Sequence, residues 1–498
     1  MYKLMSGLLA SIVLAGCNGG GGDSQYANRL EGKAYCPASM ECSYMPAPKD
    51  YNNEAGGAVN IYYGVHKALD PANRLGILVF NFGGPSAAAV SGVGVMIEKG
   101  LISQDALNRF DIVGIDPRGT GASAFAKELT ECAVAQYKGQ GNCNATYAQV
   151  APYLGSNSVV KDIDRLRLHL GEQKLNFLGY SYGTRLGSLY ANMFPDNVRA
   201  IVLDSPMSPT AANYVDLLIE GAAGNDKIAD YRLESSARKT TLVSIVEQIR
   251  SNSSSQYIAS DASTLTKIDV DLSLDLMVSR DSSDPRYPRW LSIKNEVYKL
   301  LDSNNASGLS QKLLGMHNRS NAQSEDRLRG RALFTAVVCT DESQPLSLND
   351  FAASETKFQS ASKLYGDLTY NSIRAKMCAD WPYPRDPIAP VEAMEQVLSG
   401  QQILIIGGHY DPATPYTWAE KMVQSFGTLA SLVTVDNYVD HGFSYSKISC
   451  VDQKTTAYLL DPETKIADET CNASTLSQSK SFMISPDVPH PAKDVIGW

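Results

Sequence analysis

The chain has 498 residues, 44% of them hydrophobic and 19% charged, and its formal net charge is −9. This composition is that of a folded globular protein, and the length allows more than one compact unit. The acidic excess excludes the basic surface that nucleic acids or anionic membranes require, so no nucleic-acid partner is expected.

The N-terminal segment is typical of an export signal. Lys3 precedes an apolar stretch at residues 7–16, which is too short to span a bilayer. The sequence LAGC at residues 14–17 resembles a bacterial lipobox, and a Gly-rich tether follows at residues 19–22. We therefore predict that a lipid on Cys17 anchors the exported protein in the cell envelope, facing the periplasm or the cell surface. The alternative is a plain secretory signal in which this cysteine is incidental.

Eight cysteines remain beyond Cys17, and an even number in an exported chain predicts disulfide bonds. No CxxC motif occurs and only six histidines are present, so neither a metal centre nor a cofactor is expected. Paired by nearness in the sequence, the cysteines form four couples: Cys36–Cys42, Cys132–Cys143, Cys339–Cys378 and Cys450–Cys471.

Along the chain, short apolar runs alternate with helical patterns. Strands are predicted at residues 77–82, 110–115, 175–180, 200–204, 402–408 and 432–436, and helices at 159–170 and 184–193. Such an alternation predicts an α/β fold, in which a mostly parallel sheet has helices on both faces.

The alternation breaks after residue 210 and returns only near residue 402. Residues 211–380 are mainly helical in pattern and include a Ser-rich stretch at 251–264, which we interpret as a surface loop. A sheet interrupted in this way predicts a core with an inserted cap. The predicted organisation is 1–16 signal peptide, 17–35 lipidated cysteine and tether, 36–210 first part of the core, 211–384 helical cap, 385–471 second part of the core, and 472–498 a C-terminal tail without an assigned function.

A GxSxG motif at Gly179–Gly183 lies between a predicted strand and a predicted helix. This context is typical of the nucleophile elbow of α/β-hydrolases, where a sharp turn lifts a serine hydroxyl above the sheet. The motif therefore predicts Ser181 as a nucleophile. The alternative is a Gly-rich turn that carries the serine by chance.

A serine nucleophile needs a histidine base and an acid that orients it, and in this fold they follow in the order serine, acid, histidine. His441 lies a few residues beyond the last predicted strand, whereas the other histidines lie too early, at a strand tip or in the tail. Asp411 follows the strand at 402–408, at the sheet edge where ligand chemistry collects. Asp436 and Asp440 are rival acids, but they lie very close to the histidine in the sequence.

An oxyanion hole requires two backbone N–H donors. The amide of Tyr182, directly after the nucleophile, is one candidate. The second should come from the glycine loop after residues 77–82, where we favour Gly84 over Gly83. These glycines could also serve only to permit a tight turn.

Taken together, these motifs resemble the secreted tripeptidyl-aminopeptidase branch of the α/β-hydrolases, close to the prolyl aminopeptidases. The resemblance is carried by CSYMPAPKDY (42–51), NFGGPSAA (81–88), FDIVGIDPRGTGAS (110–123), LGYSYGTRLGSLYANMFPDNVRAIVLDSP (178–206), DPATPYTWAEKM (411–422), DHG (440–442) and AYLLDPETKIADETC (457–471). It implies Ser181, Asp411 and His441 as a catalytic triad, a helical cap over the site, and release of short peptides from free N-termini.

The chain departs from the family pattern near the site. Phe82 and Ser86 replace a proline and a glycine of the usual oxyanion loop, and Asp440 replaces the glycine before the histidine. An aminopeptidase must also recognise an α-ammonium, for which carboxylates are suited. Asp341 and Glu342, just after Cys339, are candidates for this role, although a solvated pair of carboxylates is the simpler interpretation.

The leading hypothesis is thus an exported serine exopeptidase whose partners are short peptides and, through its lipid, the membrane. An esterase or amidase that acts on a non-peptide acyl compound could use the same residues, because the cap decides the substrate. A third hypothesis is an envelope lipoprotein without catalytic activity.

Overall fold

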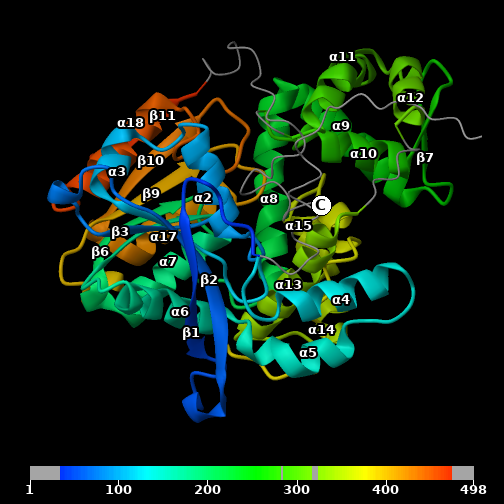
Figure 1. The fold of residues 1–498 in the computed structure, drawn as a ribbon. Coiled ribbons are helices and arrows are strands. Elements are labelled where there is room, and N and C mark those ends of the chain that lie inside the picture. The colour runs from blue at the N-terminus through cyan, green and yellow to red at the C-terminus, as the bar shows by residue number, and fades with distance from the viewer. Residues whose placement is uncertain (1–33, 282–283, 317–322, 474–498) are drawn as a thin grey trace, which may run out of the picture. The chain divides into compact units, whose positions relative to one another are not determined.

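The computed structural model describes residues 34–281, 284–316 and 323–473. Cys17, the signal peptide and most of the tether and tail therefore lie outside the described residues. A nine-stranded sheet with the order β1-β2-β4-β3-β5-β6-β9-β10-β11 organises the fold (Figure 1). Its strands are β1 (Glu41–Pro48), β2 (Ala58–His66), β3 (Ile77–Asn81), β4 (Asp111–Ile115), β5 (Leu175–Tyr180), β6 (Val198–Asp204), β9 (Ile403–Gly408), β10 (Ala430–Asp436) and β11 (Glu469–Asn472).

The sheet is mostly parallel, as predicted. β1 and β2 are antiparallel to each other and β2 is antiparallel to β4, whereas every pair from β4 to β11 is parallel. All six predicted strands are present, with ends that differ by at most two residues. β1, β2 and β11 were not predicted, because they lie at or near the sheet edges and lack continuous apolar runs.

The helices between the strands cover the sheet. They are α2 (Ala89–Glu98), α3 (Gln104–Arg109), α4 (Ala126–Tyr137), α5 (Asn144–Val150), α6 (Ser156–His169), α7 (Tyr182–Met193), α17 (Tyr416–Phe426) and α18 (Ser449–Leu460), with short 3₁₀ helices at Glu54–Gly56, Pro71–Asn73, Ala151–Tyr153, Pro195–Asn197, Met394–Gln396 and Gly427–Leu429. Because side chains alternate along a strand, Ile77 and Val79 of β3 pack in one apolar cluster with α6, α7 and α17. The intervening Leu78 and Phe80 are also fully buried, so both faces of the sheet are covered, and the structure is an α/β-hydrolase fold.

A largely helical segment lies between β6 and β9, which are neighbours in the sheet. Its elements are α8 (Tyr214–Leu233), α9 (Ser236–Ser251), β7 (Gln256–Ile258), β8 (Thr264–Thr266), α10 (Lys267–Met277), α11 (Tyr287–Ser303), α12 (Ser307–Leu314), α13 (Glu325–Asp341), α14 (Leu348–Ala353), α15 (Glu355–Ala361) and α16 (Gly366–Tyr370). Local signals start several of these helices. Thr266 and Asp269 form a capping box at α10, and Asn213 caps α8.

The Ser-rich stretch predicted as a surface loop is only partly a loop. β7 and β8 pair antiparallel across it, and Asp261 accepts the amide of Ser263 in the connecting turn. The strand pattern was hidden because each strand has only three residues and only Leu265 of them is buried.

The inserted segment does not have a single core. Residues of α8 to α12 form one hydrophobic cluster, whereas Leu333 and Val337 of α13 belong to the same cluster as the sheet. We call the elements α8 to α12, including the β7–β8 hairpin, the cap. None of the helices in the described residues is both long and apolar enough to cross a membrane.

Candidate active site

The GxSxG motif forms a sharp turn between β5 and α7. Ser181 has φ 55° and ψ −123°, a left-handed conformation that is rare for residues other than glycine. The flanking glycines are required by close packing, since a Cβ on Gly179 would lie 2.4 Å from the carbonyl oxygen of Gly183. Ser181 is therefore held in the strained geometry that is typical of a nucleophile elbow.

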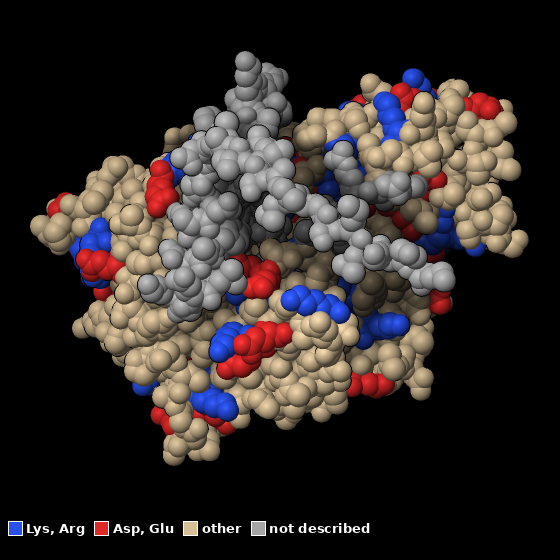
Figure 2. All heavy atoms as spheres, turned by 45° about the vertical axis from the view of Figure 1, so that its right-hand side comes forward, with Lys and Arg blue, Asp and Glu red and all other residues tan. Residues whose placement is uncertain are grey.

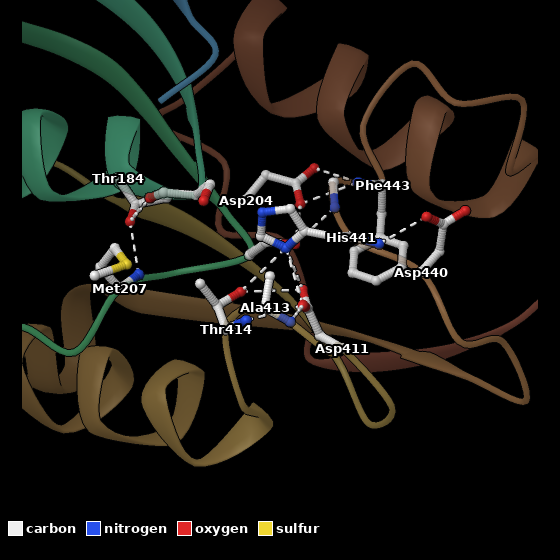
Figure 3. Close-up of polar contacts among 12 residues, drawn as sticks. Thr184, Asp204, Met207, Asp411, Ala413, Thr414, Asp440, His441 and Phe443 are labelled. Carbon is white, nitrogen blue, oxygen red and sulfur yellow. Dashed lines mark hydrogen bonds and ion pairs between the residues drawn. The ribbon is translucent and has the colours of Figure 1, made fainter. Parts of the chain in front are cut away.

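His441 and Asp411 meet at the carboxyl edge of the sheet. The imidazole Nδ1 lies 2.9 Å from Oδ1 and 2.8 Å from Oδ2 of the carboxylate, and both side chains are fully buried (Figure 3). The carboxylate also accepts hydrogen bonds from the amides of Ala413 and Thr414, at 2.8 and 2.9 Å, and from the Thr414 hydroxyl at 3.0 Å. With this carboxylate at Nδ1, the proton belongs on Nδ1 and Nε2 is the basic nitrogen.

Nε2 of His441 is buried and has no hydrogen-bond partner among the described residues. The Ser181 hydroxyl and the imidazole are therefore not hydrogen-bonded to each other in this structure. Such bonds are often long in the absence of substrate. The site therefore contains a serine in a strained conformation, Ser181, and an imidazole nitrogen, His441 Nε2, that bonds to no other described group. Asp411 binds the opposite nitrogen of the same ring.

The rival acids have other partners. Asp436 lies 3.1 Å from Nδ1 of His409. Asp440 accepts the backbone amide of His441 at 2.9 Å through Oδ1, so its carboxylate holds the main chain that carries the base. This contact gives the carboxylate of Asp440 a role in holding the main chain at His441.

The loop that should supply the oxyanion donors lies directly against the elbow. A Cβ on Gly83 would lie 2.4 Å from the carbonyl oxygen of Tyr180 and 2.8 Å from the amide nitrogen of Tyr182. The amide of Gly83 donates to Oδ1 of Asn81 at 2.9 Å. Among the described residues, no such acceptor is found for the Gly84 amide. The geometry thus leaves Gly84, rather than Gly83, available as a donor beside Tyr182.

The side chain of Phe82 packs between Tyr180 and Gly92 of α2. Its ring stacks on Tyr180 with centroids 5.6 Å apart, and a Cβ on Gly92 would lie 2.4 Å from the same ring. The aromatic side chain is thus accommodated by a glycine on α2. Because Tyr180 directly precedes Ser181, the Phe82 ring packs against the strand that leads into the elbow.

Asp204, at the end of β6, was missed by the sequence reasoning. Its carbonyl oxygen accepts the amide of Ser181 at 2.9 Å, and its carboxylate accepts the amides of Phe443 and Ser444. Burial raises its pKa to about 6. Asp204 therefore connects Ser181 to the residues that follow His441, and Figure 3 shows its carboxylate beside Phe443. The available signal was an aspartate that ends the apolar run at 200–204.

Asp341 and Glu342, predicted as ligands of a substrate ammonium, are buried and accept hydrogen bonds from within the protein. Asp341 accepts hydrogen bonds from Tyr182 Oη at 2.7 Å and from Ser156 Oγ at 2.6 Å. Glu342 accepts the amide of Tyr214 at 2.9 Å and pairs with Arg385 at 2.8 Å. The cavity they line measures about 10 Å³, room for one water molecule. These internal contacts argue against the predicted role.

Burial also raises the pKa of both carboxyls, that of Glu342 to about 7. A raised pKa reflects an unfavourable environment for the anion, which is the form that would attract an ammonium group. The sequence could not reveal these partners, because Ser156 and Tyr214 are far from Asp341 and Glu342 along the chain.

All eight cysteines of the described residues form disulfides, in the four predicted couples. Charged side chains on the face shown in Figure 2 are of both signs and interspersed, without a large basic area. This agrees with the absence of a basic excess in the composition.

The fold and this site define a serine hydrolase of the α/β-hydrolase class. Residues 362–471 match the family described as TAP-like protein. The chain is 26% identical to a tripeptidyl aminopeptidase of Streptomyces lividans over 87% of this chain and 84% of that protein. It is also 26% identical to the serine protease Hip1 of Mycobacterium tuberculosis over 87% of this chain and 88% of Hip1. A carboxylesterase B of Mycobacterium tuberculosis is 27% identical, over 85% of this chain and 84% of that protein.

The protein is therefore an enzyme, a serine hydrolase with a TAP-like C-terminal region.

Proposed function

We propose that the protein is an exported serine aminopeptidase that releases short peptides, such as tripeptides, from free N-termini. The observation that carries the proposal is the buried contact between Asp411 and His441 Nδ1, which leaves Nε2 as the basic nitrogen, on a loop that Asp204 joins to the elbow of Ser181. The similarity to a tripeptidyl aminopeptidase along most of both chains supports a peptide substrate.

In the proposed mechanism, Nε2 of His441 takes the proton of Ser181 as its oxygen attacks the scissile carbonyl carbon. The amides of Gly84 and Tyr182 stabilise the resulting oxyanion. His441 then returns the proton to the leaving amine, and an acyl-enzyme forms on Ser181. Water, activated by the same histidine, hydrolyses the acyl-enzyme and regenerates the serine. Asp411 stays ionised and stabilises the imidazolium at each step.

A substrate panel tests this proposal. Chromogenic amides of tripeptides, dipeptides and single residues should be compared with their N-blocked forms and with simple esters. We expect the free tripeptide amide to be cleaved fastest and its N-blocked form at least tenfold more slowly. Turnover of esters alone would refute the peptidase proposal and favour the esterase alternative, which the similarity to a carboxylesterase also suggests.

Labelling with a fluorophosphonate separates both enzymatic candidates from a binding lipoprotein. The wild type should be labelled and Ser181→Ala should not. A wild type that resists labelling while folded would contradict any serine-hydrolase mechanism.

The proposal assigns no ammonium-binding role to Asp341 and Glu342, because their oxygens already accept internal hydrogen bonds. We expect Asp341→Asn and Glu342→Gln to keep the preference for free over N-blocked substrates within about twofold, although either variant can lower stability. Loss of the preference in a folded variant would restore the role predicted from the sequence.

We further propose that the mature protein is lipid-anchored through Cys17 outside the cytoplasm. The four disulfides support an oxidising compartment. Metabolic labelling with a fatty acid should mark the wild type and not Cys17→Ala. Equal labelling of both proteins would refute the anchor and leave a plain secretory signal as the explanation.

A further inference from the structure

The end of β6 holds the main chain that follows His441. The amide of Gly442 donates to Ser205 Oγ at 2.9 Å, and Asp204 accepts the next two amides. All of these acceptors lie at the end of β6. A further support acts on Val439, two residues before His441.

That support comes from the cap. The amide of Asp281 donates to the carbonyl oxygen of Val439 at 2.7 Å, and the amide of Val439 donates to Oδ2 of Asp281 at 3.0 Å. This reciprocal pair fixes both polar groups of one residue, two positions before the base. The Val439 side chain is fully buried and belongs to the hydrophobic cluster of the cap, not to that of the sheet.

The Asp281 carboxylate is itself oriented by the cap. Arg232, in the last turn of α8, donates to Oδ1 of Asp281 at 2.8 Å and to the carbonyl oxygen of Ser279 at 2.8 Å. Its guanidinium also lies over the ring of Tyr287, 5.1 Å from the centroid. Oδ1 is therefore occupied by the arginine, which leaves Oδ2 directed at Val439.

A second contact from the same helix end reaches the acid. Tyr231 stacks on Tyr410 with ring centroids 4.2 Å apart, and Tyr410 directly precedes Asp411. Tyr231 contacts the loop of Asp411 directly, and the next residue, Arg232, contacts the loop of His441 through Asp281. A cap that moves must either carry these loops with it or break these contacts.

We propose that Asp281 is a positioning residue that couples the cap to the catalytic base through Val439. It touches neither substrate nor reacting atoms. It holds the main chain two residues before His441 and so fixes the position of the imidazole. This inference concerns the serine-hydrolase chemistry and does not depend on whether the substrate is a peptide.

The test uses the rate of phosphonylation by a small fluorophosphonate, which reports on Ser181 and His441 without occupying a peptide site. We expect Asp281→Ala to lower this rate about tenfold. Asp281→Asn should give a smaller loss than the alanine variant, about threefold, because an asparagine has only one carbonyl oxygen for the two donors that the carboxylate serves, Arg232 and the Val439 amide. Asp302→Ala is the control, since Asp302 is an exposed carboxylate of the cap that pairs with Arg238.

Thermal unfolding of each variant separates positioning from general destabilisation. If Asp281 had only a structural role, its loss would lower Tm but would not lower the phosphonylation rate at temperatures where the protein is folded. A wild-type rate in folded Asp281→Ala would overturn the proposal.

If Asp281→Ala does not fold, Arg232→Gln replaces it. This variant keeps the backbone contact and removes only the cation that orients the carboxylate, so we expect about a threefold loss. A wild-type rate in Arg232→Gln would then overturn the proposal. A peptidase assay that fails for every substrate would leave this result intact, so the two proposals fail independently.

Discussion

At the scale of single residues, the chemistry depends on which carboxylate reaches the histidine. Three aspartates bond to His441 or to the residues that follow it, and each has a different set of partners. Asp411 binds the imidazole, Asp440 binds the main chain, and Asp204 binds the loop that follows. A role assigned to any of them can therefore be tested by a single substitution.

Replacing Asp411 with asparagine keeps the shape of the site but can stabilise the wrong tautomer of His441. Loss of the equivalent acid in serine hydrolases costs about 10⁴-fold in kcat, and we expect a loss of about this size in steady-state assays. Asp436→Asn is the matched control, because Asp436 also pairs with a histidine. Asp436 ends β10, and its partner His409 follows the neighbouring strand β9. Its activity should stay within about threefold of the wild type. Equal losses in the two variants would contradict the assignment.

The raised pKa of Asp204 predicts a pH dependence of stability. Since the folded-state pKa of about 6 lies above the value of an exposed carboxyl, the folded state binds the proton more tightly than the unfolded state. This contribution to stability is fully present below about pH 4 and is lost as the pH rises through 6. It amounts to about 3 kcal/mol between these limits.

The measurement is Tm from pH 4 to 8 for the wild type and Asp204→Asn. The Tm of the wild type minus that of the variant should fall between pH 4 and 6 and level off above 7. Asp196→Asn, at an exposed position just before the same strand, controls for the substitution. A difference that rises with pH would show that the ionised carboxylate is the form stabilised by folding.

At the scale of elements, the site depends on the close approach of the β3 loop to the β5–α7 elbow. Gly83 has φ 74°, and a Cβ there would meet the backbone of Tyr180 and Tyr182. Both the conformation and the contact exclude other residues.

We expect Gly83→Ala to abolish activity and to destabilise the fold by several kcal/mol, because backbone atoms cannot move aside as a side chain can. Gly139→Ala is a matched control. Gly139 also has a positive φ, 68°, but a Cβ there would have no atom within 4 Å. The control should lose only about 1–2 kcal/mol, from left-handed strain alone, and should keep its activity. Urea unfolding and probe labelling of both variants measure the two effects, and equal losses would contradict the contact argument.

At the scale of the whole molecule, the disulfides contribute unequally. In the chain-entropy treatment, a cross-link stabilises more when it closes a longer loop. The Cys339–Cys378 bond spans a sequence separation of 39 and joins α13 to the segment after α16, whereas Cys36–Cys42 spans 6.

We therefore expect removal of Cys339–Cys378 by a double alanine substitution to cost about 4 kcal/mol, and removal of Cys36–Cys42 about 2 kcal/mol. Denaturant unfolding of the two variants under oxidising conditions measures the difference. A larger loss for the short loop would show that native packing around these sulfurs, and not loop length, sets the stability.

The amino-acid sequence by itself determined the α/β class, the strands β3 to β6, β9 and β10, and the elbow at Ser181. These features are local, since a buried parallel strand is a continuous apolar run and an elbow needs its glycines within five residues. The pairing of the cysteines could be predicted for the same reason, because each cysteine pairs with a cysteine that is near it in the sequence.

Only the tertiary structure decided the partners of buried polar groups. Asp341, predicted as a substrate ligand, accepts hydrogen bonds from Ser156 and Tyr182. Asp204, predicted only as the end of a strand, bonds to both Ser181 and the loop after His441. A buried carboxylate must find donors wherever the fold brings them, and those donors lie more than a hundred residues away. The contact between Asp281 and Val439 is of the same kind, because it exists only where the cap meets the core.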